Sequence, residues 1–160
     1  MARYRFAMRA LLILLSLLGV SAAAQTTNSA TGRIVKVLPF FLDLQGQNAK
    51  SPSLFDRDAY QAYLLQHTNE ISAMRIDVWW KAAPAPGEKI KIALELRGVG
   101  TNSMPKLETL ETNVVPGKHR QWTAIPLAGG DYKNIGTVVA WRARLWDDSQ
   151  LLSEQKSFLW

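Results

Sequence analysis

Apolar and polar residues alternate along much of this chain, as they do in β-strands that have one buried and one solvent-facing side. The alternation is clearest at positions 89–97 and recurs at 74–81 and 139–146. Three inward rows are therefore expected: Met74, Ile76, Val78 and Trp80; Ile90, Ile92, Leu94 and Leu96; and Val139, Trp141, Ala143 and Leu145.

Four weaker strands complete the pattern. They are expected at 33–42, 106–114, 121–127 and 151–159, and residues typical of turns occupy 83–87, 98–102, 116–117, 129–131 and 147–150. Seven short strands separated by turns favour an antiparallel β-sandwich of the immunoglobulin or fibronectin type III kind. We expect a single domain of this mainly β class over residues 32–160.

One segment departs from the strand pattern. Residues 53–67 favour a helix, because Ser53 or Asp56 can cap its N-terminus and Asp56 and Asp58 place negative charge in its first turn. The helix would be inserted between the first and second strands. We expect it to lie against the sandwich through one apolar stripe, formed by Phe55, Ala59, Ala62 and Tyr63.

The first 24 residues have the three parts of a secretory signal peptide. Arg3, Arg5 and Arg9 form a charged region, residues 10–20 are apolar, and 21–24 are small residues suited to cleavage before Gln25. Residues 25–31 are expected to be a flexible spacer. The sequence thus predicts an exported protein, periplasmic or extracellular, with no transmembrane segment after cleavage; the alternative is an uncleaved N-terminal anchor.

Charge and cysteine content narrow the functional classes. The 160 residues carry a formal net charge of +6, but without the first 24 residues the charge is only +3. The basic character is therefore too weak to indicate a nucleic-acid partner. Because the chain has no cysteine, thiolate metal sites, iron–sulfur clusters and cysteine nucleophiles are excluded.

The candidates for catalysis are few. His67 and His119 are far apart in sequence and have no carboxylate at metal-ligand spacing, and no nucleophile-elbow, zincin or phosphate-loop motif occurs. Two acidic pairs, Asp56/Asp58 and Asp147/Asp148, are placed for capping and turn formation and do not face each other across a cleft. We expect no enzyme, no metal and no cofactor; an enzyme with an unrecognised site stays an alternative.

The six tryptophans offer a candidate binding surface. Trp80 and Trp141 belong to inward rows, and Trp122 is not assigned to either side. If two of the strands share a sheet, an exposed patch results, formed by Trp79, Arg142, Arg144 and Trp146. Such a patch could stack on a sugar ring or on a protein surface. In the competing interpretation, the helix or a long loop covers this side and the tryptophans form a small second core.

Three stretches of the chain carry a resemblance: 32–43 (GRIVKVLPFFLD), 51–60 (SPSLFDRDAY) and 154–160 (EQKSFLW). With them the chain resembles a family of secreted bacterial proteins of unknown function. The resemblance implies a bacterial source and an exported single domain. It implies no activity and assigns no functional residue.

These observations favour a non-enzymatic interaction module of the bacterial envelope, which binds a protein or envelope component through a sheet face or an unpaired edge strand. One alternative is a carbohydrate-binding module that stacks Trp79 and Trp146 on sugars. A second is a small outer-membrane β-barrel, since the chain ends in the aromatic residue Trp160. Charged residues at Glu154 and Lys156 would then face lipid, which disfavours that alternative.

Overall fold

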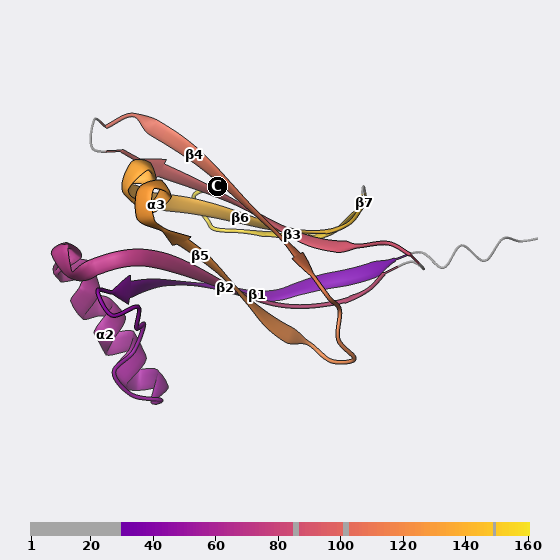
Figure 1. Cartoon of the computed structure of the whole chain (residues 1–160), viewed down its shortest axis with the longest axis horizontal. Helices are drawn as coiled ribbons and strands as arrows, with labels where there is room; N and C mark the ends of the chain where they lie inside the picture. The colour runs from indigo at the N-terminus through magenta and orange to yellow at the C-terminus, as the bar shows by residue number, and fades with distance from the viewer. Residues whose placement is uncertain (1–29, 85–86, 101–102, 149) are drawn as a thin grey trace, which may run out of the picture.

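The structure is a computed structural model that describes residues 30–84, 87–100, 103–148 and 150–160. Within these ranges, seven strands form two separate antiparallel sheets, one of three strands and one of four. The fold is therefore mainly β, with two facing layers (Figure 1). In the described parts of the chain, no helix has the length and apolar character needed to cross a membrane.

The first sheet, here called sheet A, has the strand order β1-β2-β5 and contains β1 (Thr31–Asp43), β2 (Ile71–Ala83) and β5 (Gln121–Ala128). The second, sheet B, has the order β4-β3-β6-β7. Its strands are β4 (Pro105–Val114), β3 (Ile90–Val99), β6 (Thr137–Asp147) and β7 (Gln150–Lys156).

Among the described residues, two helices and one short 3₁₀ turn accompany the strands. Helix α2 (Leu54–Gln66) and the turn η1 (Thr68–Glu70) lie between β1 and β2, and helix α3 (Gly129–Ile135) lies between β5 and β6. Residues 129–131, expected to form a turn, instead begin α3. Both helices lie at the same end of the sandwich (Figure 1).

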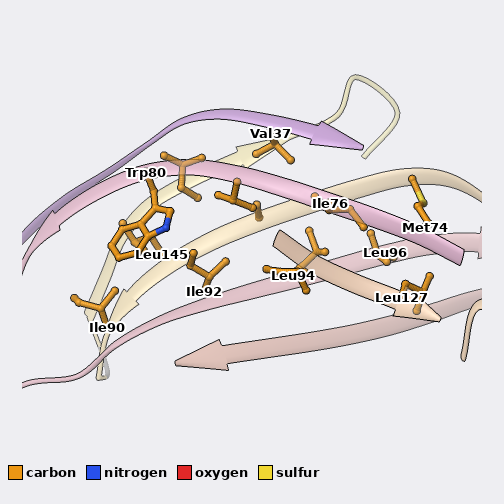
Figure 2. Packing of buried hydrophobic residues seen from close by; sticks show 14 of the residues in the cluster. Val37, Met74, Ile76, Trp80, Ile90, Ile92, Leu94, Leu96, Leu127 and Leu145 are labelled. Atoms are coloured by element: carbon orange, nitrogen blue, oxygen red, sulfur yellow. The ribbon is translucent and has the colours of Figure 1, made fainter. Parts of the chain in front are cut away.

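The core lies between the sheets, and two of the expected inward rows are confirmed in full. Met74, Ile76, Val78 and Trp80 of β2 are buried, as are Ile90, Ile92, Leu94 and Leu96 of β3. Figure 2 shows the labelled members of both rows, among them Trp80, Ile92 and Leu94, in one layer with Leu127 of β5 and Leu145 of β6. The indole N–H of the buried Trp80 donates to Oγ1 of Thr123 at 2.8 Å, so burial leaves this donor satisfied.

The third inward row is wrong at its first member. Val139 is 45% exposed, whereas Ala143 and Leu145 are fully buried. In the pairing of β3 with β6, Gly98 is opposite Val138 and Arg97 opposite Ala140, so Val139 is the extra residue of a bulge. A bulge shifts the alternation by one residue, so Val138 packs on the core and Val139 does not.

The stripe expected to dock α2 is also wrong. Phe55 is 81% exposed and Tyr63 40% exposed, and Leu64 is the one buried residue of the helix. The helix is held mainly by hydrogen bonds: the Gln61 side chain accepts from the backbone N–H of Phe41 at 2.7 Å and donates to its carbonyl oxygen at 2.9 Å. Gln61 thus pairs with the free edge of β1 as a neighbouring strand would.

Asp43, at the end of β1, is the second anchor of α2. Its carboxylate accepts hydrogen bonds from the Lys50 ammonium at 2.7 Å, the Tyr60 hydroxyl at 2.7 Å and the backbone N–H groups of Gln45 and Gln47. Burial by itself raises the pKa of Asp43, but these bonds outweigh burial and hold the pKa well below its ordinary value. The ionised carboxylate therefore ties together β1, the following loop and α2.

The last strand ends earlier than expected, at Lys156 rather than 159. The pairing with β6 ends at Ser157. Its N–H still donates to the Trp141 carbonyl oxygen at 2.9 Å, but the Trp141 N–H donates to the Ser157 hydroxyl at 3.0 Å, and the Ser157 carbonyl oxygen accepts from the Trp160 N–H. Phe158 and Leu159 are exposed. This turn brings Trp160 back over sheet B, where its ring lies above Arg97 and Arg142.

Candidate functional site

The four residues of the expected patch do not lie together. Trp79 is in β2 of sheet A, whereas Arg142, Arg144 and Trp146 are in β6 of sheet B. Each of the four lies between residues that are buried or pack on the core, so its own side chain points away from the core. The outer faces of the two sheets lie on opposite sides of the sandwich. The assumption that both strands share a sheet is wrong, and two separate surfaces must be considered.

The surface on sheet B is occupied by the protein's own residues. Glu95 of β3, only 8% exposed, accepts hydrogen bonds from the guanidinium groups of both Arg142 and Arg144. The Trp160 ring lies 4.0 Å from the Arg97 guanidinium carbon and 4.7 Å from that of Arg142. The outer side of β3 is therefore less solvated than the alternation of residues 89–97 indicates.

Trp146 belongs to the same closed arrangement. The Arg144 guanidinium lies over its ring, 5.3 Å from the centroid, and the Trp146 side chain is half-buried. Cation–π contacts of this kind use the ring face that a sugar or a partner would need. The arginines and Trp146 thus form an internal network rather than an open platform.

The surface on sheet A is different. Trp79 of β2 stands directly opposite Trp122 of β5 in the strand register, and the two rings stack at 5.7 Å between centroids and 12° between planes. The Arg120 guanidinium lies 5.6 Å from the centroid of the Trp79 ring. Trp122 is 50% exposed. Trp79 thus supports an aromatic ring that is half open to solvent.

A shallow hollow of about 300 Å³ adjoins this ring. It is lined by Leu38, Phe40, Asn48, Arg57, Asp77 and Trp122. Asp77 is held by the Arg75 guanidinium through bonds of 2.8 and 2.9 Å, so its carboxylate is fixed but keeps lone pairs for a further donor. The hollow combines an aromatic side, an apolar floor and several hydrogen-bonding groups.

Helix α2 covers part of this outer side of sheet A. Phe40 of β1 faces outward, opposite Arg75 in the register, yet it is only 7% exposed. The guanidinium of Arg57, from α2, lies 5.0 Å from the Phe40 ring centroid. Helix α2 therefore covers the Phe40 half of the sheet, as one interpretation of the sequence predicts for this side, but it leaves Trp122 open.

Trp122 is the residue that sequence reasoning missed. In β5, Ile125 and Leu127 are buried, so the alternation places Trp122 on the outward side with Ala124 and Pro126. That signal was available in the sequence. That Trp79 is its neighbour could not be predicted, because this contact depends on which strands are adjacent and in which register they pair.

Three of the residues considered for catalysis, His67, Asp56 and Asp58, have partners within the chain. The His67 ring stacks on Tyr63 at 3.9 Å, and its Nδ1 lies 2.9 Å from the Tyr63 carbonyl oxygen. Asp56 lies in the first turn of α2, where its side chain accepts from the Ser51 hydroxyl, and Asp58 binds the Arg57 guanidinium. Within the described ranges, no group of three or more possible ligands is arranged to hold a metal ion.

In one pair of neighbouring carboxyl groups, Glu88 and Asp148, the pKa of Glu88 is shifted. Glu88 hydrogen-bonds the Asp148 side chain, and this bond, with the nearby negative charge, raises the pKa of Glu88 above its ordinary value. Glu88 lies in the connection between β2 and β3, and Asp148 lies in the connection between β6 and β7, where its N–H donates to the Lys89 carbonyl oxygen at 3.0 Å. The pair joins two loops and lines none of the hollows described here.

A larger cleft opens at the end of the sandwich that carries both helices. Its volume is about 580 Å³, and it lies between the end of β1, the end of β3 and the start of β6. Six of its lining side chains are aromatic or aliphatic: Phe41, Leu65, Ile71, Val99, Tyr132 and Val138.

Comparison of the chain with protein-family models, with curated proteins and with solved structures finds no match.

Proposed function

We propose that this protein is a non-catalytic binding module that docks a protein or another envelope component on the outer face of sheet A. Trp79 and Trp122 would form the centre of the contact. The observation that carries this proposal is the half-exposed Trp122 ring, stacked on Trp79 and adjoining a hollow lined by polar side chains.

Trp122 is suited to binding because the stacked Trp79 ring holds it in place. A tryptophan that is already held by its neighbour loses little conformational freedom on binding, and it offers a large apolar face with a polar rim. Binding energy in protein interfaces concentrates in such aromatic anchors. Sheet B offers no comparable residue among its predicted candidates, because Trp146 and both arginines are engaged within the chain.

The proposal includes a fold type. We infer a sandwich of the fibronectin type III kind, because β4 pairs with β3 at the edge of sheet B. In constant-type immunoglobulin domains the fourth strand instead joins the sheet of the first, second and fifth. In this interpretation α2 is an insertion between the first two strands, and domains of this kind serve widely as binding modules.

The proposal also includes export. The charged, apolar and small-residue parts of 1–24 support it, although they lie outside the described residues. A chain without cysteine is compatible with an oxidising compartment, where its stability must come from the core. The resemblance to secreted bacterial proteins points the same way.

A carbohydrate is the second candidate for the ligand of this face. The hollow places the Trp122 ring near Asp77 and Asn48, and sugars are bound by an aromatic face together with neighbouring hydrogen-bonding groups. This interpretation replaces the expected pair of Trp79 and Trp146 with Trp79 and Trp122.

The test is a matched pair of substitutions on opposite faces. Immobilised wild-type protein, Trp122→Ala and Trp146→Ala are exposed to extracts of the producing cell's envelope and, separately, to soluble polysaccharides and cell-wall fragments. We expect a bound component that Trp122→Ala loses by at least about tenfold and that Trp146→Ala retains.

Urea unfolding of both variants controls for loss of the fold. A component retained by both variants, or lost equally from both, would contradict the assignment to sheet A. Saturation by a polysaccharide with a change in tryptophan fluorescence would favour the carbohydrate candidate over a protein partner.

A further inference from the structure

The cleft at the helical end of the sandwich adjoins a junction of close backbone contacts. A Cβ on Gly98 of β3 would lie 2.4 Å from the carbonyl oxygen of Ile135, at the end of α3. A Cβ on Gly136 would lie 2.2 Å from the Val99 carbonyl oxygen, and Gly136 has a φ of +69°. Only glycine permits both approaches, so the junction of β3, α3 and β6 is closely packed and the cleft is formed without a ligand.

The size and lining of the cleft resemble those of small-molecule sites. Its volume of about 580 Å³ lies within the range of roughly 300–1,000 Å³ that such sites occupy. Two of its apolar lining residues are open to solvent: Leu65 is 59% exposed and Val99 38% exposed. Apolar side chains held at the edge of a preformed cavity favour an apolar occupant over a hydrated one.

The polar groups of the cleft are few and lie among the apolar ones. Thr68 and Thr137 contribute hydroxyl groups, and Tyr132 contributes a phenol whose pKa is raised by burial. Like any tyrosine at neutral pH, it is protonated and can donate a hydrogen bond. Of the described residues that line the cleft, Lys133 alone carries a charge, and it is exposed at the rim.

We propose that this cleft binds a single-chain amphiphile, with its alkyl chain against the apolar walls and an anionic headgroup, such as a carboxylate, at Lys133 and the neighbouring hydroxyl groups. The apolar lining selects a hydrocarbon chain, because a sugar or a peptide backbone would leave polar groups unpaired there. The single positive charge at the rim selects an anion over a neutral or cationic head.

The cleft and the Trp79–Trp122 surface share no lining residue, so the two sites can be tested separately. In this proposal the outer face of sheet A binds one component while the end of the sandwich holds an amphiphile. The proposal does not depend on the function assigned to sheet A.

Calorimetric titrations with dodecanoate and dodecanol, each kept below the concentration at which it self-associates, test two parts of the proposal. They show whether the cleft binds an alkyl chain and whether a negatively charged headgroup contributes to binding. We expect saturable binding of both at one site, and decanoate should bind about tenfold more weakly than dodecanoate, because each methylene is worth about three- to fourfold in affinity. Lys133→Gln should weaken dodecanoate at least threefold and leave dodecanol unchanged. Lys118→Gln removes the same charge from an exposed turn outside the cleft and should change neither.

Leu65→Asp tests the location. It places a carboxylate at the cleft rim on a side chain that is already 59% exposed, so the fold should survive, as a urea melt will verify. We expect it to weaken dodecanoate and dodecanol at least tenfold, whereas Trp122→Ala should weaken neither. The proposal is overturned by an absence of saturable binding, by equal effects of Lys133→Gln and Lys118→Gln, or by unchanged binding in Leu65→Asp.

Discussion

The outer faces of the two sheets contain the same kinds of residue but present them differently. On sheet A, Trp122 rests on Trp79 and half of its surface stays open to solvent. On sheet B, Trp146 and Trp160 lie against arginines that are themselves bonded to Glu95. One face is available for binding, whereas the other is largely satisfied within the chain.

The contrast shows that tryptophan and arginine on an outward row do not by themselves make a binding surface. Whether such residues are available for binding depends on two features. One is whether a neighbouring strand supplies a counter-charge to the arginines, and the other is whether another segment of the chain covers the outward side chains. On sheet B, β3 supplies Glu95 and the end of the chain supplies Trp160. On sheet A, the covering segment is α2, which lies over Phe40 and leaves Trp122 open.

The largest effect is expected from removing the counter-charge of sheet B. Glu95→Gln leaves the guanidinium groups of Arg142 and Arg144 partly buried without their carboxylate. We expect the free energy of unfolding to fall by about 2–3 kcal/mol, somewhat less than for a fully buried pair, because both arginines keep some exposure. Urea unfolding at neutral pH measures the change.

Glu111→Gln is the matched control on the same sheet. It breaks the ion pair between Lys91 and Glu111, whose side chains are 34% and 51% exposed. Such a surface pair is worth less than about 1 kcal/mol. If the two substitutions destabilise the protein equally, the outer side of sheet B is not the closed network described here.

A smaller effect is expected at the anchor of α2, which limits the open area of sheet A. Asp43→Asn removes the charge that Lys50, Tyr60 and two backbone N–H groups bind. We expect a loss of about 2 kcal/mol at neutral pH, within the range for a hydrogen bond to a charged group.

The same substitution should change the acid limb of the stability curve. The pKa of Asp43 is lower in the folded protein than the value of about 3.9 in an unfolded chain. The stabilisation is therefore complete above about pH 5 and is lost as the pH falls through about 4 and below. Asp43→Asn should flatten the fall of unfolding free energy in this range; an unchanged slope would contradict the role given to Asp43.

The smallest effect is expected for the ring that covers sheet B. Trp160→Ala removes the contacts with Arg97 and Arg142 and should lower the free energy of unfolding by about 1 kcal/mol. Binding of the component captured by sheet A should stay unchanged. Loss of that component in Trp160→Ala, with retention in Trp122→Ala, would reverse the roles of the two faces.

Much of the fold follows from local alternation, since a strand between core and solvent must alternate wherever its geometry is regular. The rows of β2 and β3 are of this kind. The predictions are wrong where the strand geometry is irregular or the contact is polar. The irregular places are the bulge at Val139 and Ser157, where the pairing of β7 ends. The polar contact is that of α2, which docks through Gln61 and Asp43 instead of an apolar stripe.

The candidate site could be predicted only in part. The outward position of Trp79 follows from the alternation along its own strand, and that of Trp122 could have been derived in the same way. That the two rings stack, and that Arg142 and Arg144 meet Glu95 instead of Trp79, depends on which strands are neighbours.

The sequence by itself determined the class of the fold, the two main inward rows and the outward position of the residues discussed, because these depend on the two-residue period of a strand. The tertiary structure alone decided which outward residues are open. It did so through the pairing of β2 with β5, the network around Glu95 and the cleft formed where both helices meet the strand ends. The physical reason is that exposure depends on residues distant in sequence, whereas the direction of a side chain from its strand is a local property.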